Sequence, residues 1–586
     1  MNYRLFKVIT VALSISFMSV CACRAAETEA EGETKPETKP EVKQTLKKNK
    51  GFEVLKYLNP VPEKNYTNAS QDRLIKKQAF KASEMPNLQP AANREVGFFA
   101  IVAADKLADK DYLNSLLTNP RTNGISATID WRQLEPGEEK YDWTAVDNLL
   151  HLCQAAKKTL ILRVSTCGID GPADEGKTSC DTPAWVFEAG AKSVKYLDKD
   201  GKANLMPLFW DQTYLAAFSN FISEMGSRYD KNPLLHSVGI TGGGFLGGTS
   251  LVPTTTLGNK SDKTATAETG FGSADQIETH LRKKEGLNQK QIIDHWKYVA
   301  DLFPQAFPNT TLNFAINPPT PNRAGEDALD EISDYLLYRY GQHIYVTRQN
   351  LKNGKHGFDD YRVLLKFRPD TYEGLALLPE FPAAELEKIA KTALDDGISF
   401  IEIPVEVLSS KEPVALTALD KLSSHMGYQI VSKKIALDNQ LEQGEPLKVD
   451  FTFVNLGDAV AKRPVRELDK DVPQSYKVMV ELKDSSGKPV AQLLHTPTKG
   501  TLDWSAGEMI SWQHSLRMPN LTPGDYAATV SLIDPNSNRK IILIDGRTAD
   551  QLAHTEAMPA GTLRILVKGS GSKTTSSLQS TSTSTK

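Results

Sequence analysis

The sequence predicts an α/β chain in which a (β/α)8 TIM barrel is followed by a C-terminal antiparallel β-sandwich. From residue 97 to 427, short apolar or β-branched runs alternate with longer segments of helical periodicity, a pattern typical of βα repeats around a parallel sheet. From residue 428 to 568, short segments alternate apolar and polar side chains and are separated by turn residues. An open doubly wound sheet is the alternative for the first part, but no glycine-rich phosphate turn follows its first strand.

Eight strands and the helices between them are expected in the barrel. The strands are expected at Gly97 to Ala103, Ile125 to Asp130, Leu160 to Ser165, Ser237 to Thr241, Thr311 to Asn317, His343 to Thr347, Gly374 to Glu380 and Ser399 to Pro404. The clearest helices are expected at Thr144 to Lys157, Gln212 to Tyr229, Gln289 to Phe307, Glu326 to Tyr340 and Pro382 to Asp395. Eight such pairs close a barrel more readily than they form an open sheet.

The N-terminal residues have the pattern of an export signal. A basic start precedes the apolar run from Val8 to Val20, which is too short to span a bilayer. Residues 1–23 are expected to be a signal peptide, with Cys23 lipidated in a bacterial lipobox; simple cleavage near Ala25 is the alternative. Residues 24–50 are rich in Glu, Lys, Pro and Thr and are expected to be a disordered tether, and residues 51–96 a lead-in segment. The Ser/Thr-rich residues 569–586 are expected to be a disordered tail.

Composition limits the partners. The 586-residue chain is 40% hydrophobic and has a net charge of −3, with acidic and basic residues interspersed. The chain has no basic patch of the kind that binds nucleic acid, and its charge favours a neutral ligand. Membrane association is expected only through the lipid anchor. Beyond the leader, Cys153 is expected to be a buried apolar residue, and Cys167 and Cys180 are expected to form a disulfide. No cysteine has metal-ligand spacing, and neither a metal nor another cofactor is expected.

The ends of the predicted strands carry the candidate binding residues, because TIM-barrel sites lie at the C-terminal face. These candidates are Asp130, Trp131, Arg163, Thr241, Asn317, Gln349, Asn350 and Glu380, together with Trp185 in a loop before a helix. Trp131 and Trp185 are candidates for stacking on sugar rings, with core packing as the alternative. Arg163 lies within a strand and needs a carboxylate partner, Asp130 or Glu402, if it is buried.

Several motifs resemble those of retaining (β/α)8 glycoside hydrolases of the bacterial β-galactosidase type. They are Trp131 with Glu135-Pro136 and Tyr141-Asp142-Trp143, then Thr182-Pro-Ala-Trp185, Phe209-Trp-Asp211 and Arg228-Tyr-Asp-Lys-Asn-Pro233. The resemblance implies an acid/base glutamate at the end of the fourth strand and a nucleophilic glutamate at the end of the seventh. Glu380 stands at the second of these positions, with a helix-capping role as its alternative.

The fourth strand departs from the family pattern, because Ser237 to Lys260 contains no carboxylate. Glu268 and Glu278, in the following loop, are weak candidates for a relocated acid/base. The sequence therefore predicts an exported glycoside hydrolase-like protein acting on a poly- or oligosaccharide, for example a β-galactoside, and retaining if active. A non-catalytic glycan-binding protein of the cell envelope is the alternative, and the sequence does not indicate an oligomeric state.

Overall fold

The structure is a computed structural model. It describes residues 96–167, 181–197, 203–242, 266, 268, 270–272, 274–319, 323–349, 358–368, 371–377, 381–462, 475–534, 538–547 and 553–569. The expected signal peptide with Cys23, the tether, the lead-in segment up to residue 95 and the tail from residue 570 lie outside these ranges. None of the helices in the described ranges is both long and apolar enough to cross a bilayer.

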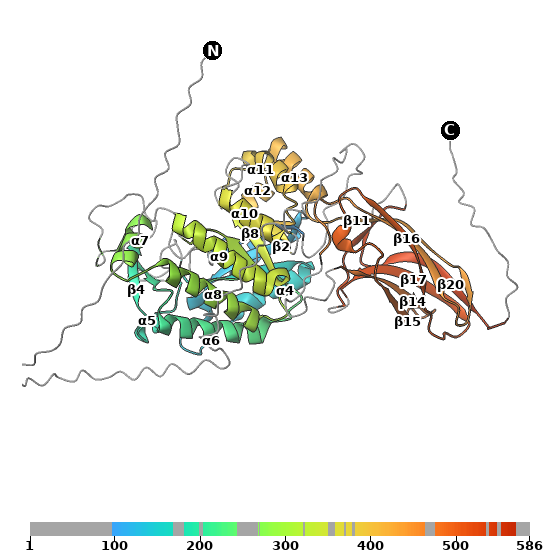
Figure 1. The fold of residues 1–586 in the computed structure, drawn as a ribbon, viewed down its shortest axis with the longest axis horizontal. Coiled ribbons are helices and arrows are strands. Elements are labelled where there is room, and N and C mark those ends of the chain that lie inside the picture. The colour runs from blue at the N-terminus through green and yellow to red at the C-terminus, as the bar shows by residue number, and fades with distance from the viewer. Residues whose placement is uncertain are drawn as a thin grey trace, which may run out of the picture. The chain divides into compact units, whose positions relative to one another are not determined.

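The predicted (β/α)8 barrel is confirmed: within the described residues, eight parallel strands close in the order β1-β10-β9-β8-β7-β6-β3-β2 (Figure 1). Their bounds are β1 Gly97–Ile101, β2 Thr122–Asp130, β3 Thr159–Ser165, β6 Leu235–Gly239, β7 Leu312–Ile316, β8 Ile344–Gln349, β9 Glu373–Ala376 and β10 Phe400–Ile403. A short antiparallel hairpin of β4 (Ser193–Leu197) and β5 (Ala203–Pro207) lies between β3 and β6 and was not predicted.

Helices surround the barrel and begin at recognisable caps. Asp211 accepts the backbone N–H groups of Thr213 and Tyr214 at the start of α6, and Asn288 and Gln291 form a capping box on α8. The helices of four or more residues are α2 Lys110–Thr118, α3 Trp131–Leu134, α4 Thr144–Ala156, α5 Ala184–Glu188, α6 Gln212–Tyr229, α7 Ala274–Lys283, α8 Gln289–Ala306, α9 Arg323–Tyr340, α10 Phe358–Phe367, α11 Leu386–Asp395, α12 Val405–Leu408 and α13 Pro413–His425. Their apolar faces pack on outward-facing strand residues such as Phe98 and Ile125.

The first inward-facing layer of the barrel is mostly aromatic. Phe99, His236, Tyr345 and Phe400 meet there, with ring centroids 4.5–6.0 Å apart. Gly374 makes room for this layer, because a Cβ at that position would lie 2.3 Å from the Phe400 ring. Within the described residues, aromatic rings therefore fill this layer at the N-terminal end of the barrel.

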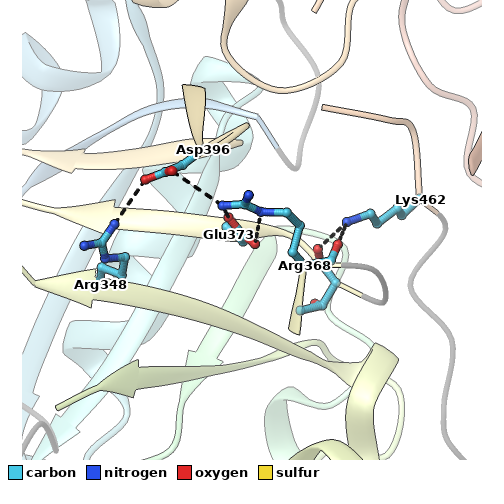
Figure 2. A network of polar contacts seen from close by, with 6 residues as sticks. Arg348, Arg368, Glu373, Asp396 and Lys462 are labelled. Atoms are coloured by element: carbon cyan, nitrogen blue, oxygen red, sulfur yellow. Dashed lines mark hydrogen bonds and ion pairs between the residues drawn. The ribbon is translucent and has the colours of Figure 1, made fainter. Parts of the chain in front are cut away.

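A network of buried charges braces the outer side of β8 and β9 at that same end (Figure 2). The Arg348 guanidinium lies 3.1 Å from the Asp396 carboxylate, and Arg368 lies 3.1 Å from Glu373 and 3.6 Å from Asp396. Lys462, in the segment after β13, donates to the backbone carbonyls of Arg368 and Thr371. Burial raises the pKa of Glu373, and the neighbouring Arg368 and Lys462 act against that rise.

The C-terminal region forms two five-stranded sheets, with strand orders β16-β13-β11-β18-β19 and β12-β20-β17-β14-β15. The pairs are antiparallel, as predicted, except for β11–β18 and β12–β20, which are parallel. The bounds are β11 Ile430–Leu437, β12 Gln440–Glu442, β13 Leu447–Asn455, β14 Lys477–Lys483, β15 Pro489–His495, β16 Met509–Leu516, β17 Gly524–Ile533, β18 Leu543–Asp545, β19 Ala553–Thr555 and β20 Met558–Leu566. Alternate side chains of both sheets share one core.

Two histidines join the edge strands of these sheets. His495 on β15 and His514 on β16 stack with ring centroids 3.6 Å apart, and the Trp512 indole N–H donates to His495 Nε2 at 3.0 Å. Because an indole nitrogen can only donate, His495 Nε2 must be unprotonated, so His495 is neutral. Burial, and then the nearby His514, lowers the pKa of His495 to about 4.

This arrangement predicts that acid weakens the sandwich. The unfolded histidine has a pKa near 6.5, so between pH 6.5 and pH 4 the unfolded state binds more protons and stability falls with falling pH. His495→Gln retains an acceptor for Trp512 but cannot be protonated, and we expect it to lose less stability between pH 7.5 and pH 4.5 than the unaltered protein. Urea unfolding followed by tryptophan fluorescence at both pH values measures the difference; equal losses would contradict the prediction.

Candidate functional site

The second inward-facing layer of the barrel holds a buried ion pair. Arg163 on β3 donates to both carboxylate oxygens of Glu402 on β10, at 2.5 and 2.6 Å, and Ser126 on β2 donates to the same carboxylate at 2.5 Å. The side chains of Arg163 and Glu402 are 11% and 4% exposed. Of the two carboxylates expected as partners for Arg163, the structure thus selects Glu402. A bidentate pair of this kind compensates the charge that folding removes from water.

A glycine in the fourth strand of the barrel accommodates this arginine. Gly239 lies on β6, and a Cβ built there would be 2.6 Å from Cγ of Arg163. Any side chain at position 239 would therefore displace the arginine. Position 239 itself therefore cannot carry a carboxylate without moving Arg163.

The C-terminal ends of β2 and β3 carry two further carboxylates. Asp130 accepts hydrogen bonds from its neighbour Arg132, at 2.9 and 3.1 Å. Asp181 is buried, accepts from the hydroxyl of Ser165 at 2.5 Å, and its carbonyl accepts the backbone N–H of Arg132. Asp181 was not among the predicted site residues. The signal for it was its position immediately before the Thr182-Pro-Ala-Trp185 motif.

Trp131 is a correction to the sequence analysis. Its side chain is fully buried, with ring centroids 5.3 Å from Phe218 and 6.1 Å from Tyr214, and its indole N–H donates to Glu135 at 2.9 Å. A ring enclosed in this way has no face left for a sugar. The core alternative holds for Trp131 because α3 turns it towards α6 instead of the mouth.

Glu135 explains the motif that begins at Trp131. Its carboxylate accepts from the Trp131 indole and from the backbone N–H of Glu139 at 3.0 Å, and its carbonyl accepts from the indole of Trp185 at 3.1 Å. Burial raises the pKa of Glu135 to about 7, while these hydrogen bonds act to lower it. The buried Glu135 therefore links Trp131 and Glu139 through its carboxylate and Trp185 through its backbone carbonyl.

The remaining candidates are spread around the barrel. Trp185 and Asn317 are half-buried, and Gln349 is the last residue of β8, with its side chain outside the described residues. Glu278 lies on α7, where it is buried and paired with Arg282 at 2.8 Å. Glu268 is exposed, and its backbone carbonyl accepts from Lys195.

Several decisive residues lie outside the described ranges. Asn350, Glu380 and Cys180 are among them, as are residues 243–265 after the fourth strand. The nucleophile, the relocated acid and the disulfide thus stay predictions. Cys153 and Cys167 are both buried, and across the described residues no three metal-ligating side chains gather as a metal site requires.

Removing one member of the buried pair should destabilise the barrel strongly. Glu402→Gln leaves the Arg163 charge buried without its counter-ion, and we expect a loss of about 3–5 kcal/mol in the free energy of unfolding. The double variant Arg163→Met/Glu402→Leu removes both charges and should be much closer to the unaltered protein. Urea unfolding of the single and double variants forms the test; additive losses would show that the two residues do not act as a pair.

The expected Cys167–Cys180 bridge can be tested with the exported protein. Thiol titration of the unfolded, unreduced mature chain should find Cys153 free and the loop cysteines unreactive. Reaction of all three thiols without reductant would rule out the disulfide. A Cys180→Ser variant provides the control, since it should release one additional thiol at Cys167.

No family model matches the chain, and no curated protein matches it. Among solved structures, the catalytic domain of a beta-amylase from Paenibacillus polymyxa is similar, with 12% sequence identity and a TM-score of 0.37. That likeness covers 56% of this chain and 98% of the beta-amylase chain. At these values the likeness carries no argument, and the (β/α)8 fold of this chain rests on its own closed strand order.

Proposed function

We propose that this chain is an exported glycoside hydrolase-like protein that takes a poly- or oligosaccharide into the C-terminal mouth of its barrel and acts on the O-glycosidic bond. The observation that supports this most is the polarity of the barrel interior. The first inward layer is aromatic, whereas the second contains Ser126, Arg163, Asn313, Thr347 and Glu402. A site lined by hydroxyl, amide and paired charged groups suits a neutral ligand rich in hydroxyl groups.

Charge supports a neutral sugar over an ionic ligand. The single positive side chain in the described part of the second layer, Arg163, is already neutralised by Glu402. An anionic ligand would have to compete with a bidentate carboxylate for that guanidinium. In this proposal, half-buried Trp185, whose indole donates to the Glu135 carbonyl, supplies an aromatic ring for the sugar.

Catalysis in this proposal centres on Glu380 as nucleophile, with Asn317, Gln349 and Asn350 on the neighbouring strand ends as binding residues. Retaining hydrolysis also needs a second carboxyl about 5 Å away, to protonate the leaving group. The fourth strand supplies none within its sequence, and Glu278 is engaged by Arg282. Without a general acid, the rate falls by about 10²–10⁴-fold for unactivated substrates.

A second candidate function is glycan binding without hydrolysis. The observation that favours it is that three carboxylates described near the strand ends already serve other groups. Glu402 holds Arg163, Asp130 holds Arg132, and Asp181 holds Ser165. Under this alternative, a β-galactoside or another glycan occupies the same mouth and leaves unchanged.

The two functions differ in their response to Glu380→Gln. If Glu380 is the nucleophile, this variant should lose turnover of an aryl β-galactoside, whose leaving group needs little protonation, while its affinity for oligosaccharides on a glycan array stays within about twofold. Release of the phenol and array binding are the two measurements.

Glu387→Gln, at an exposed position on α11, is the matched control and should change neither measurement. Binding without any turnover in the unaltered protein would favour the second candidate. Fast cleavage of an unactivated oligosaccharide would show that a general acid is present in the site. If the unaltered protein binds no glycan at all, both functions are overturned.

A further inference from the structure

The residues that follow β13 of the sandwich are bonded to the barrel at several points. We call residues 456–462 the bridging segment. The backbone N–H of Asp458 donates to the carbonyl of His425 at the end of α13, and that of Ala459 donates to the carbonyl of Gly427, both at 2.8 Å. These bonds join backbone to backbone, so they do not depend on the choice of side chains.

The bridging segment also approaches the end of the barrel closely. A Cβ built on Gly457 would lie 2.2 Å from the carbonyl oxygen of Gly427 and 2.7 Å from Cα of Tyr428. Any other residue at position 457 would therefore push the two backbones apart. The boundary between barrel and sandwich is thus a packed contact, unlike the polar linkers with few contacts that usually separate independent domains.

Lys462, at the end of the bridging segment, is buried against the residues that precede β9. Its ammonium donates to the backbone carbonyls of Arg368 and Thr371, the second at 2.7 Å (Figure 2). Its backbone N–H donates to the hydroxyl of Tyr372, which in turn donates to the Lys462 carbonyl, both at 2.7 Å. Lys462 is 8% exposed, and a buried ammonium is tolerated only where such acceptors are supplied. Here the barrel supplies them.

Aromatic side chains continue this contact. The ring of Tyr372 lies 5.4 Å from that of Tyr345 on β8 and 5.9 Å from that of Tyr428, between α13 and β11. All three are buried and belong to one hydrophobic cluster, which contains the inner aromatic layer of the barrel and the core of the sandwich. Separating the two regions would expose part of this shared core to water.

We propose that the β-sandwich is a structural partner of the barrel, which fixes the start of β9 through Lys462 and unfolds together with the barrel. An accessory module attached by a linker would instead unfold by itself. The bonds lie at the N-terminal end of β9, so the inference is independent of the function proposed for the C-terminal mouth.

Hydrogen exchange of the full chain in increasing urea, followed by mass spectrometry of its peptides, tests this proposal. Peptides from residues 97–427 and from residues 428–568 should lose protection at the same urea concentration. Lys462→Met leaves the carbonyls of Arg368 and Thr371 without this donor. We expect it to lower the midpoints of both sets of peptides by about 0.5 M.

Lys434→Met is the matched control, because it makes the same substitution on an exposed lysine of the sandwich. Lys434 on β11 pairs with Asp450 at 3.0 Å on the surface, where such a pair contributes little, and both midpoints should stay unchanged. If Lys462→Met does not fold, Tyr372→Phe is the milder variant. It removes one hydroxyl from the same contact and should also lower both midpoints.

Four outcomes would overturn the proposal. Separate midpoints for the two sets of peptides in the unaltered protein would show an independent module. A shift confined to residues 428–568 in Lys462→Met would show that the barrel does not depend on this contact. The absence of a shift in both Lys462→Met and Tyr372→Phe would show that the contact contributes nothing. An equal shift in Lys434→Met would assign the effect to the loss of a sandwich charge.

Discussion

The permanent positive charge of Arg163 inside the barrel constrains the strands around it. An unpaired guanidinium in that position would be too costly to bury, so Glu402 on the last strand and Ser126 on the second meet it. On its other side, position 239 on the fourth strand is a glycine, because a Cβ there would clash with the Arg163 side chain. Ser126, Gly239 and Glu402 are far apart in the sequence but all adjoin Arg163. A change at any of them therefore affects the packing of the others.

The Arg163–Glu402 pair also lies where the barrel interior changes from aromatic to polar side chains. Below it, the first layer is filled by Phe99, His236, Tyr345 and Phe400, and the same core continues through Tyr372 and Tyr428 into the β-sandwich. In the layer of the pair itself, Ser126, Asn313 and Thr347 add hydroxyl and amide groups. A barrel packed at one end and polar at the other has a single end at which a ligand can enter, and this is the end where barrel enzymes place their sites.

The sequence predicted the barrel well, because alternation of strands and helices is a local pattern with a global consequence. It also predicted that Arg163 needs a carboxylate, since the charge cannot be buried alone. It could not predict that Trp131 is enclosed, because an aromatic residue after a strand is equally compatible with core and mouth, and only the turn into α3 decides. Asp181 was missed because its partner, Ser165, is a residue type with no distinctive spacing.

The carboxylates described near the strand ends are engaged by other groups, which limits the chemistry they can perform. Glu402 offers both oxygens to Arg163 and could attack or protonate a substrate only by breaking that pair. Under the proposed function, any hydrolysis therefore depends on Glu380 and on the segment that follows the fourth strand.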